Sequence, residues 1–287
     1  MTPSTLISVI VSTYNRPDTL SMVLEALNRQ SDMVFEVVIA NDGSTDETRA
    51  MIERMKTKVA FSITHVWQED KGFRLAAIRN LAVKSAKGDY LIFLDGDSIP
   101  SLRWVERHRA LAEKGWMVTG QRILASKDFT LALLNDPTLM GRLEWTFRNF
   151  VCLWRDKKIN RPWPGLDLHL GYIRKMWAHN WHKVRGCNWA MWKADYVAVN
   201  GSDETIVGWG SEDSDLAVRL LNYGVTIKSG IFSLGVLHLW HKELPKNHSK
   251  NNFEVAKRRE TEKIIYPRIG LIPDAELRLE DKKKIIC

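Results

Sequence analysis

The chain has 287 residues, 45% of them apolar, and its 17 glycines and 9 prolines are an ordinary share for a folded protein. This composition excludes disordered, collagen-like and low-complexity chains. A chain of this length buries roughly three quarters of its unfolded surface, so it needs neither disulfides nor a structural metal for stability. No segment approaches the roughly 18 uninterrupted apolar residues of a membrane span, and residues 1–15 lack the features of a signal peptide. We therefore expect a globular, cytoplasmic protein.

Cysteine spacing and charge indicate the cellular compartment and the kinds of binding partner. Cys152, Cys187 and Cys287 show no C-x-x-C spacing, which disfavours a disulfide framework or a zinc site and fits a reducing compartment. There are 42 Lys and Arg against 34 Asp and Glu, a net charge of +8. Residues 141–185 alone hold ten basic and three acidic residues and five of the 12 tryptophans. Such a surface suits nucleic acid, anionic lipid headgroups or a phosphorylated small molecule, and composition does not distinguish them.

The first 120 residues alternate strand and helix signals at short spacing, which predicts an α/β fold with a mostly parallel sheet. Pro17 suits the first turn of a helix, and Ser44 and Glu47 have the spacing of a capping box. The predicted strands are 7–13, 35–40, 61–66, 90–94 and 117–119. The predicted helices are 17–30, 44–55, 74–87 and 102–114.

The second half is less regular. Residues 121–185 show poor periodicity and predict helical pieces and long loops. The later predictions are an extended segment at 187–192, a mobile loop at 208–210, a helix at 212–223, short strands at 225–228 and 235–239, and from residue 242 a tail with a helix and an exposed basic end. We divide the chain into two halves of one domain, 1–120 and 121–241, followed by a tail at 242–287.

Polar residues follow three of the predicted strands, at 13–16, 41–42 and 95–97. In open parallel sheets, ligands bind beyond the carboxyl ends of the strands. Any single Asp-Gly pair is more simply explained as a turn. Three polar strand ends at one edge of a sheet make a binding site the better interpretation.

Asp95 and Asp97 follow a fully apolar strand, which holds two carboxylates within about 7 Å of each other. Carboxylate oxygens suit Mg²⁺ or Mn²⁺. His238 and His241 follow another short strand, and an added imidazole ligand favours Mn²⁺. Each histidine is also well explained as a hydrogen-bonded structural residue, so both assignments stay open.

Several segments resemble family 2 glycosyltransferases of the GT-A fold. These segments are 9–16 (VIVSTYNR), 40–46 (ANDGSTD), 70–80 (DKGFRLAAIRN) and 93–97 (FLDGD). Residues 186–188, 200–201 and 208–215 resemble the carboxy-terminal half of galactosyltransferases, N-acetylgalactosaminyltransferases and bacterial chondroitin-type polymerase domains. The resemblance covers about residues 5–242, with a gap in the Trp-rich middle. It implies that 1–120 binds the nucleotide sugar and that 121–241 is the acceptor and catalytic half.

The resemblance implies the following residues around the nucleotide sugar: Thr13, Tyr14, Arg16, Asp42, Arg79, Asp95, Gly186 and Asn188. Thr13, Tyr14 and Arg16 would surround the base, which Asp42 would contact. Arg79 would lie near the base or the diphosphate, and Asp95 would touch the ribose or the metal. Residues 186–188 would form part of the wall of the donor pocket.

The resemblance also implies a metal site and a catalytic pair. Asp97 would be the direct metal ligand, assisted by Asp95, and His241 matches the late metal-binding histidine better than His238 does. Asp213 matches the catalytic base. Glu212 would bind the acceptor hydroxyl, and Trp209 would offer an aromatic face to a sugar ring. Ser211 stands where galactosyltransferases usually have glycine, and a helix-dipole role is the simpler explanation of the acids at 212–215.

These features predict an inverting glycosyltransferase that uses Mn²⁺ or Mg²⁺. The expected donor is a UDP-hexose or UDP-N-acetylhexosamine, and the expected acceptor is a glycan or glycolipid of surface polysaccharide, lipopolysaccharide or capsule assembly. A nucleotidyltransferase is an alternative, but residues 13–17 are not the Gly-rich phosphate loop that it requires. A basic nucleic-acid-binding module is a second alternative, although we expect no nucleic-acid partner.

The tryptophans of residues 141–185 have two interpretations, of which core and lid packing is preferred to acceptor binding. They are Trp145, Trp154, Trp163, Trp177 and Trp181. The interleaved cations of this segment are usually a solvated face. Alternatively, they place the protein peripherally at the inner face of a membrane that bears anionic or lipid-diphosphate acceptors.

Overall fold

The computed structural model describes residues 6–136, 138–141, 143, 145–242 and 249–272. It contains a seven-stranded sheet with the order β3-β2-β1-β4-β8-β6-β9. Its strands are β1 (Ile7–Thr13), β2 (Phe35–Asn41), β3 (Ile63–Trp67), β4 (Tyr90–Asp95), β6 (Trp116–Thr119), β8 (Asn188–Trp192) and β9 (Thr226–Ser229). β8 runs antiparallel to both of its neighbours, and the other pairings are parallel. The predicted α/β class is confirmed, and strands from both halves of the chain share this sheet.

A second sheet of three short strands has the order β5-β10-β7. Its strands are β5 (Ser98–Pro100), β7 (Gln121–Leu124) and β10 (Gly235–His238). β10 was predicted, whereas β5 and β7 were not. The antiparallel pairing of β10 with β5 places His238 opposite Ser98, and this register brings the end of β10 beside the end of β4.

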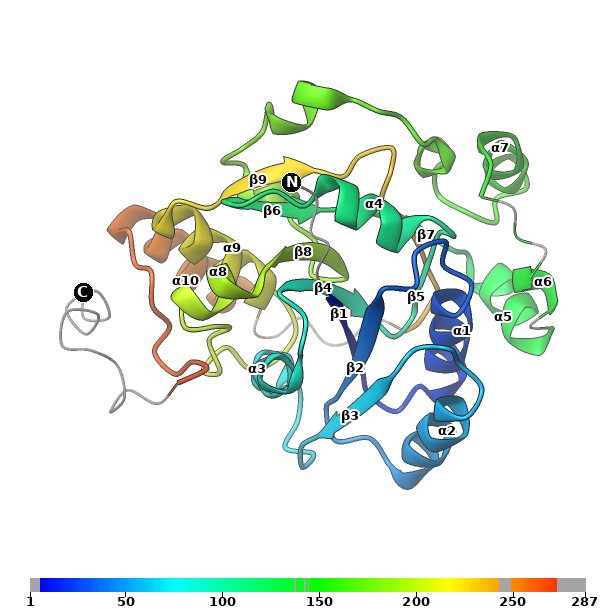
Figure 1. Cartoon of the computed structure of the whole chain (residues 1–287), viewed down its shortest axis with the longest axis horizontal. Helices are drawn as coiled ribbons and strands as arrows, with labels where there is room; N and C mark the ends of the chain where they lie inside the picture. The colour runs from blue at the N-terminus through cyan, green and yellow to red at the C-terminus, as the bar shows by residue number, and fades with distance from the viewer. Residues whose placement is uncertain (1–5, 137, 142, 144, 243–248, 273–287) are drawn as a thin grey trace.

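Helices cover both faces of the large sheet (Figure 1). The α-helices are α1 (Pro17–Leu27), α2 (Asp46–Lys56), α3 (Leu75–Ser85), α4 (Trp104–Leu111), α5 (Lys127–Asn135), α6 (Thr138–Gly141), α7 (Phe147–Arg155), α8 (Lys193–Ala198), α9 (Glu212–Tyr223) and α10 (Ser249–Glu262). Short 3₁₀ helices are η1 (Trp163–Gly165), η2 (Gly171–Lys175) and η3 (Trp181–Lys183). The predicted helices of the first half are present but shorter, and α9 has the predicted bounds.

The capping box predicted for α2 is wrong. Thr45 is the N-cap residue and its side chain makes no cap hydrogen bond. The Ser44 hydroxyl instead accepts a hydrogen bond from the Asn15 backbone N–H at 2.8 Å, and the Asn41 side chain accepts from the Ser44 N–H at 3.0 Å. Ser44 therefore connects the loops that follow β1 and β2 rather than starting a helix.

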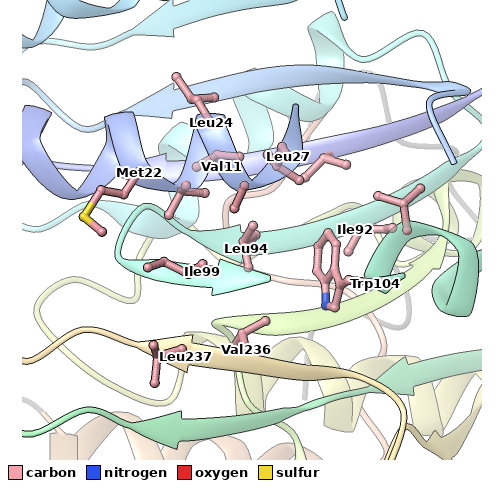
Figure 2. Packing of buried hydrophobic residues seen from close by; sticks show 14 of the residues in the cluster. Val11, Met22, Leu24, Leu27, Ile92, Leu94, Ile99, Trp104, Val236 and Leu237 are labelled. Atoms are coloured by element: carbon pink, nitrogen blue, oxygen red, sulfur yellow. The ribbon is translucent and has the colours of Figure 1, made fainter. Parts of the chain in front are cut away.

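Alternating residues of the central strands enter two different cores, as the two-residue period of a strand requires. In β1, Val9 and Val11 belong to one core and Ile10 to the other, and all three are fully buried. Figure 2 shows the first core, in which Val11 packs against Leu24 of α1 and Leu94 of β4. Each such side chain contributes about 1.5–3 kcal/mol through burial. The sheet is therefore a rigid base for the loops at its edge.

In the described part of the tail, α10 packs against α9. Arg259 of α10 makes ion pairs with Asp203 and with Asp215 of α9, and Asp215 also pairs with Arg219 at 2.9 Å. All of these side chains are buried. This network holds the start of α9 in place. The predicted basic end of the tail, with Cys287, lies outside the described residues.

Core packing explains only part of the Trp-rich segment. Trp181 is 2% exposed and Trp145 packs against the first core. Trp154, Trp163 and Trp177 are 48%, 54% and 41% exposed, so core packing does not account for them. Across the described residues, every helix is too short or too polar to cross a lipid bilayer.

Candidate active site

The three polar strand ends predicted from the sequence do meet at one edge of the large sheet. The Asp42 N–H donates to the Thr13 carbonyl at 3.0 Å, and the Gly96 N–H donates to the Ser12 carbonyl at 2.7 Å. A Cβ at Gly96 would lie 2.8 Å from that same carbonyl oxygen, so only glycine permits this approach. The ends of β1, β2 and β4 therefore form one continuous polar surface.

Asp42 lies at the β2 end of this surface and is nearly buried. Its carboxylate accepts hydrogen bonds from the Arg74 backbone N–H at 2.8 Å and from the Gln68 side chain. Burial raises the pKa of Asp42 above its usual range. Carboxylate oxygens have further lone pairs, so Asp42 keeps capacity for a ligand beside the two donors. Neither Gln68 nor Arg74 was predicted from the sequence as part of the site.

Asp70 is a further residue that the sequence analysis missed. It accepts a hydrogen bond from the Tyr14 hydroxyl at 2.9 Å, and this contact raises the pKa of Tyr14. Gly43 has a φ of +88°, and a Cβ there would lie 2.5 Å from the Asp70 Cα. The glycine that follows Asp42 in the sequence is the feature that could have indicated this close approach between residues 43 and 70. Residues 68–74 therefore form one wall beside the loop that carries Tyr14.

Thr13 and Arg16 lie on either side of Tyr14 but differ in environment. Thr13 is buried, and its hydroxyl has no hydrogen-bond partner among the described residues. The Arg16 guanidinium lies 3.2 Å from Asp18 and is partly exposed. Both side chains thus adjoin the polar surface at the end of β1.

Arg79 of α3 is the buried cation of the site. Its guanidinium lies 3.3 Å from Asp95 and 3.6 Å from Glu212, and it donates to the Gly186 carbonyl at 2.9 Å. A fourth contact reaches the Ser12 hydroxyl at 3.3 Å. Burial raises the pKa of Asp95, although the Arg79 charge opposes that shift. Arg79 therefore links the ends of β1 and β4 to residues 186 and 212, which are more than 100 positions away in the sequence.

Asp97, His238 and His241 form the one group among the described residues with ligand atoms suited to a metal ion. The three ligand atoms lie within 4.8 Å of one another. Asp97 Oδ2 is 3.5 Å from His241 Nε2, and Asp97 Oδ1 is 3.9 Å from His238 Nδ1. The Leu239 N–H donates to the Asp97 carbonyl at 2.9 Å, which fixes the histidine segment against β4.

The hydrogen bonds of the two histidines distinguish them. His241 Nδ1 is 3.0 Å from the Lys242 carbonyl, and His238 Nδ1 is 2.9 Å from the Leu239 carbonyl. A carbonyl only accepts, so each Nδ1 carries the proton and each Nε2 holds the lone pair. For His241 the nitrogen facing Asp97 is Nε2, which can bind a metal. For His238 the nitrogen closest to Asp97 is Nδ1, which carries the proton, so this geometry favours His241.

Asp213 is held in the first turn of α9. Its carboxylate accepts hydrogen bonds from the Gly186 and Ser214 backbone N–H groups, both at 2.7 Å. A Cβ at Gly186 would lie 3.1 Å from Asp213 Oδ2, so glycine leaves room for this side chain. Ser211, the residue before α9, has a left-handed φ of 71°, a conformation that glycine adopts more easily. The backbone at Ser211 therefore has the shape that the resemblance associates with glycine.

Glu212 is largely buried beside Asp213 and Arg79. Burial and the neighbouring Asp213 charge raise its pKa to about 7, although Arg79 opposes the shift. One of its carboxylate oxygens is buried without a hydrogen-bond partner among the described residues. Glu212 is therefore a carboxyl group that can exchange a proton near neutral pH.

The raised pKa of Glu212 predicts a pH-dependent stability. The folded state binds the Glu212 proton more tightly than the unfolded state, so charging this group costs stability as pH rises from about 4.5 to 7. Glu212→Gln removes that cost. We expect the variant to be more stable than the parent by about 1–3 kcal/mol at pH 8, with a smaller gain at pH 5. Thermal unfolding at both pH values measures the difference.

Glu47→Gln, at an exposed position in the first turn of α2, is the matched control. It should show no comparable change with pH. A Glu212→Gln variant with the same stability difference at pH 5 and pH 8 would show that Glu212 has no raised pKa.

Asn188, which the resemblance places in the wall of the donor pocket, has its side chain inside the protein. Asn188 is fully buried and donates to the Gln121 and Leu234 carbonyls at 3.1 and 2.9 Å. Its oxygen accepts from the Trp104 indole at 3.0 Å. These bonds engage the side-chain polar groups of Asn188 inside the protein, where they connect β8 to Gln121, Leu234 and Trp104.

The loop at 208–210, predicted to be mobile, is tethered at both ends. The Gly208 N–H donates to the Phe73 carbonyl at 3.1 Å, and the Asn252 side chain donates to the Gly210 carbonyl at 3.0 Å. Trp209, between the two glycines, is 38% exposed. The loop therefore presents an aromatic ring at the surface close to the start of α9.

A mostly parallel sheet with carboxylates, a histidine pair and a helix-start acid at one edge defines a glycosyltransferase of the GT-A fold. The chain belongs to glycosyl transferase family 2, whose model matches residues 8–162. A second model, described as the N-terminal domain of galactosyltransferase, matches residues 168–241. The two resemblances stated from the sequence are therefore confirmed, in the predicted order along the chain.

Known proteins agree with this assignment. The chain is 27% identical to hyaluronan synthase of Pasteurella multocida over 287 aligned positions, which cover 94% of this chain and 28% of that protein. The structure of GalNAc-T7 with UDP, GalNAc and Mn²⁺ is similar, with a TM-score of 0.59, 14% identity and coverage of 88% of this chain and 48% of that one. S. aureus TarS in complex with UDP-GlcNAc gives a TM-score of 0.57, 17% identity and coverage of 97% and 69%. These structural similarities confirm the fold.

Proposed function

We propose that this chain is a metal-dependent, inverting glycosyltransferase. It moves a hexose or N-acetylhexosamine from a UDP-sugar to a hydroxyl group of a glycan or glycolipid acceptor in surface polysaccharide, lipopolysaccharide or capsule assembly. The observation that carries this proposal is the convergence of Asp97 and His241 with Asp213 at one sheet edge, around Arg79. UDP and UDP-GlcNAc in the structures of similar fold support a UDP-sugar donor.

The residues present fit a divalent cation. Asp97 offers carboxylate oxygens and His241 an imidazole nitrogen with the proton on its other nitrogen, a donor set that suits Mn²⁺. The Mn²⁺ in the GalNAc-T7 structure supports this choice. A cation bound here would offset the negative charge that develops on the diphosphate leaving group. Asp95, paired with Arg79, would assist at the ribose or the metal.

The protein side chains would orient the two substrates and move one proton. Thr13, Tyr14, Arg16 and Asp42 would hold the nucleotide base at the ends of β1 and β2. Asp213 would accept the proton of the acceptor hydroxyl as that oxygen attacks the anomeric carbon. Glu212 would bind the same hydroxyl, and Trp209 would pack against a sugar ring. A single displacement from the side opposite the diphosphate inverts the anomeric configuration.

Replacing the two histidines should change Mn²⁺ affinity to different extents. His241→Gln should lower Mn²⁺ affinity about 10- to 100-fold or more, because a ligand with a correctly placed lone pair is lost. His238→Gln should have the smaller effect, since the proton-bearing nitrogen of His238 faces Asp97. Electron paramagnetic resonance of free Mn²⁺ during titration gives both affinities. A loss of metal binding by His238→Gln alone would reverse the assignment.

A calorimetric screen of nucleoside diphosphates with and without Mn²⁺, followed by a donor panel assayed for release of nucleoside diphosphate, tests the proposed function. We expect binding of UDP that depends on metal, and UDP release from one donor sugar when an acceptor is supplied. A nucleotidyltransferase would release pyrophosphate from a nucleoside triphosphate instead. Binding of RNA or DNA that weakens with salt, without any response to UDP, would favour the nucleic-acid-binding module.

We propose a cytoplasmic location with peripheral contact at the inner face of the membrane through residues 141–185. Three exposed side chains near η2 support this contact. Tyr172, Ile173 and Met176 are 82%, 50% and 64% exposed, and Lys175 and Lys183 are close by in sequence. Co-sedimentation with anionic and with neutral vesicles tests it, and equal partitioning to both or to neither would contradict it.

A further inference from the structure

A cavity of about 240 Å³ lies beyond Asp213 at the same edge of the large sheet. Thr119 and Ser229, the last residues of the parallel strands β6 and β9, are part of its lining. Its other walls come from the start of β7 and from the segment between Trp177 and Arg185. The cavity therefore continues the row of strand ends that holds the site described above.

The charge of this cavity is entirely positive. Its lining includes four cations and no acidic residue. The cations are Arg122, Arg161, Lys183 and Arg185. Within the part of the chain that the structure describes, none of the four makes an ion pair. Like charges in one cavity repel each other, so an anion bound among them would be strongly favoured.

Arg161 and Lys183 show how the cavity is equipped for a ligand. Arg161 donates to the Arg122 carbonyl at 2.8 Å, but its Nε is buried and has no partner among the described residues. Burial and the neighbouring charges of Arg122 and Arg185 lower the pKa of Arg161. The Lys183 ammonium lies 3.8 Å from the centre of the Trp177 ring. The cavity thus combines a guanidinium group without an ion-pair partner among the described residues and an aromatic ring that carries a lysine ammonium on its face.

The order of the strands places this cavity on the acceptor side. Across the sheet, β2 and β1 carry the residues proposed to bind the nucleotide base, and β4 ends at Asp95, two residues before Asp97. β8, β6 and β9 follow in the sheet order, and the ends of β6 and β9 line the cavity. β6 and β9 lie far from β2 and β3 in Figure 1. Arg185 directly precedes Gly186, whose N–H donates to Asp213 at 2.7 Å. Asp213, the proposed general base, therefore lies between the residues proposed to bind the nucleotide and the cavity.

We infer that this cavity is an acceptor subsite for a negatively charged sugar residue. Its carboxylate or phosphate group binds the cations, among them the Lys183 ammonium that lies over the Trp177 ring. The inference rests on the proposed glycosyl transfer and adds the chemical class of the acceptor. A cavity of about 240 Å³ is below the roughly 300–1,000 Å³ of sites for drug-sized ligands, so it holds a single sugar residue.

Binding without donor tests the inference directly. The probes are a trisaccharide ending in glucuronate, the same trisaccharide with that carboxylate reduced to a hydroxymethyl group, and a trisaccharide ending in a sugar 6-phosphate. We expect the full chain to bind one or both charged probes at least about 10-fold more tightly than the reduced one, as charge-assisted hydrogen bonds imply. The preference should shrink at high salt. The phosphate and carboxylate probes together identify which anion is bound.

Variants connect the binding to this cavity. Arg161→Gln and Lys183→Gln should each lower affinity for the charged probe about 5- to 20-fold and leave the reduced probe unchanged. Lys183 is exposed, so its variant keeps the test valid if Arg161→Gln does not fold. Arg155→Gln, which removes an exposed cation of α7 outside the cavity, is the matched control and should change neither affinity.

The results separate this inference from the proposed function. Equal affinity for charged and reduced probes overturns it, and so does an Arg155→Gln effect as large as that of Arg161→Gln. Binding of RNA through the same cations, with no binding of either charged saccharide, overturns it in favour of a nucleic-acid contact. If charged probes bind as expected but UDP release is never observed, the proposed function fails alone. If UDP release proceeds equally with charged and reduced acceptors, the subsite fails alone.

Discussion

Asp213→Asn is expected to bind UDP-sugar and Mn²⁺ like the parent and to lose turnover by about 10²- to 10⁴-fold, because an amide cannot accept the proton of the acceptor hydroxyl. The side chain of Asp213 also accepts two backbone hydrogen bonds, from residues 186 and 214. An amide oxygen can keep one of these bonds but not both, so we expect a stability loss of about 1 kcal/mol. UDP release, donor binding and thermal unfolding measure the three effects separately.

Asp128→Asn is the matched control for this variant. Asp128 occupies the same position in the first turn of α5 that Asp213 occupies in α9, and it is exposed. The helix-dipole contribution of about 0.3–1 kcal/mol is therefore common to both changes. Near-parental turnover by Asp213→Asn would show that Asp213 is not the general base. Glu212 would then be tested next, whereas Asp215 would not, because it is fully buried between Arg219 and Arg259.

The predictable parts of this fold carry their signals in consecutive residues. β1, β2 and β4 are runs of buried, mostly β-branched or aromatic side chains, and α9 begins with three acids and ends before Gly224. β5 and β7 have only three and four residues and exist because β10, more than 100 positions later, pairs with both. No local pattern encodes such a pairing. The candidate metal site depends on this pairing, since β10 brings His238 and His241 to Asp97.

The contacts of Asn188 and Ser44 have the same cause. Asn188 follows Gly186 at a spacing that resembles a donor wall, yet the pairing of β8 with β4 turns its side chain towards Trp104. Ser44 has the spacing of a capping residue, but its hydroxyl accepts a hydrogen bond from the Asn15 backbone N–H instead of capping α2. In each case a partner distant in sequence competes with the local interpretation. For both residues, the amino-acid type correctly predicted that the side chain makes hydrogen bonds. Only the fold determined the hydrogen-bond partner.

Asp97→Ala is expected to have opposite effects on UDP binding in the presence and absence of metal. Arg79 pairs with Asp95 and Glu212, and the negative charges of Asp97 and Asp213 lie near these two carboxylates. Without metal, this negative surface repels a diphosphate, so removing Asp97 should leave UDP binding unchanged or improve it. With Mn²⁺, the loss of the direct ligand should weaken UDP binding by about 100-fold or more. Calorimetry in chelator and in Mn²⁺ gives both values.

Asp89→Ala is the control: Asp89 is exposed and directly precedes β4, whereas Asp97 follows the other end of that strand. It should bind UDP like the parent in both conditions. Mn²⁺ should also raise the unfolding temperature of the parent and of Asp89→Ala but not that of Asp97→Ala, because a ligand stabilises only the state that binds it. If Asp97→Ala bound UDP as tightly as the parent in Mn²⁺ and lost that binding in chelator, Asp97 would not be the metal ligand. The metal would then have to be held by Asp95 and the histidines, despite the ion pair that Asp95 makes with Arg79.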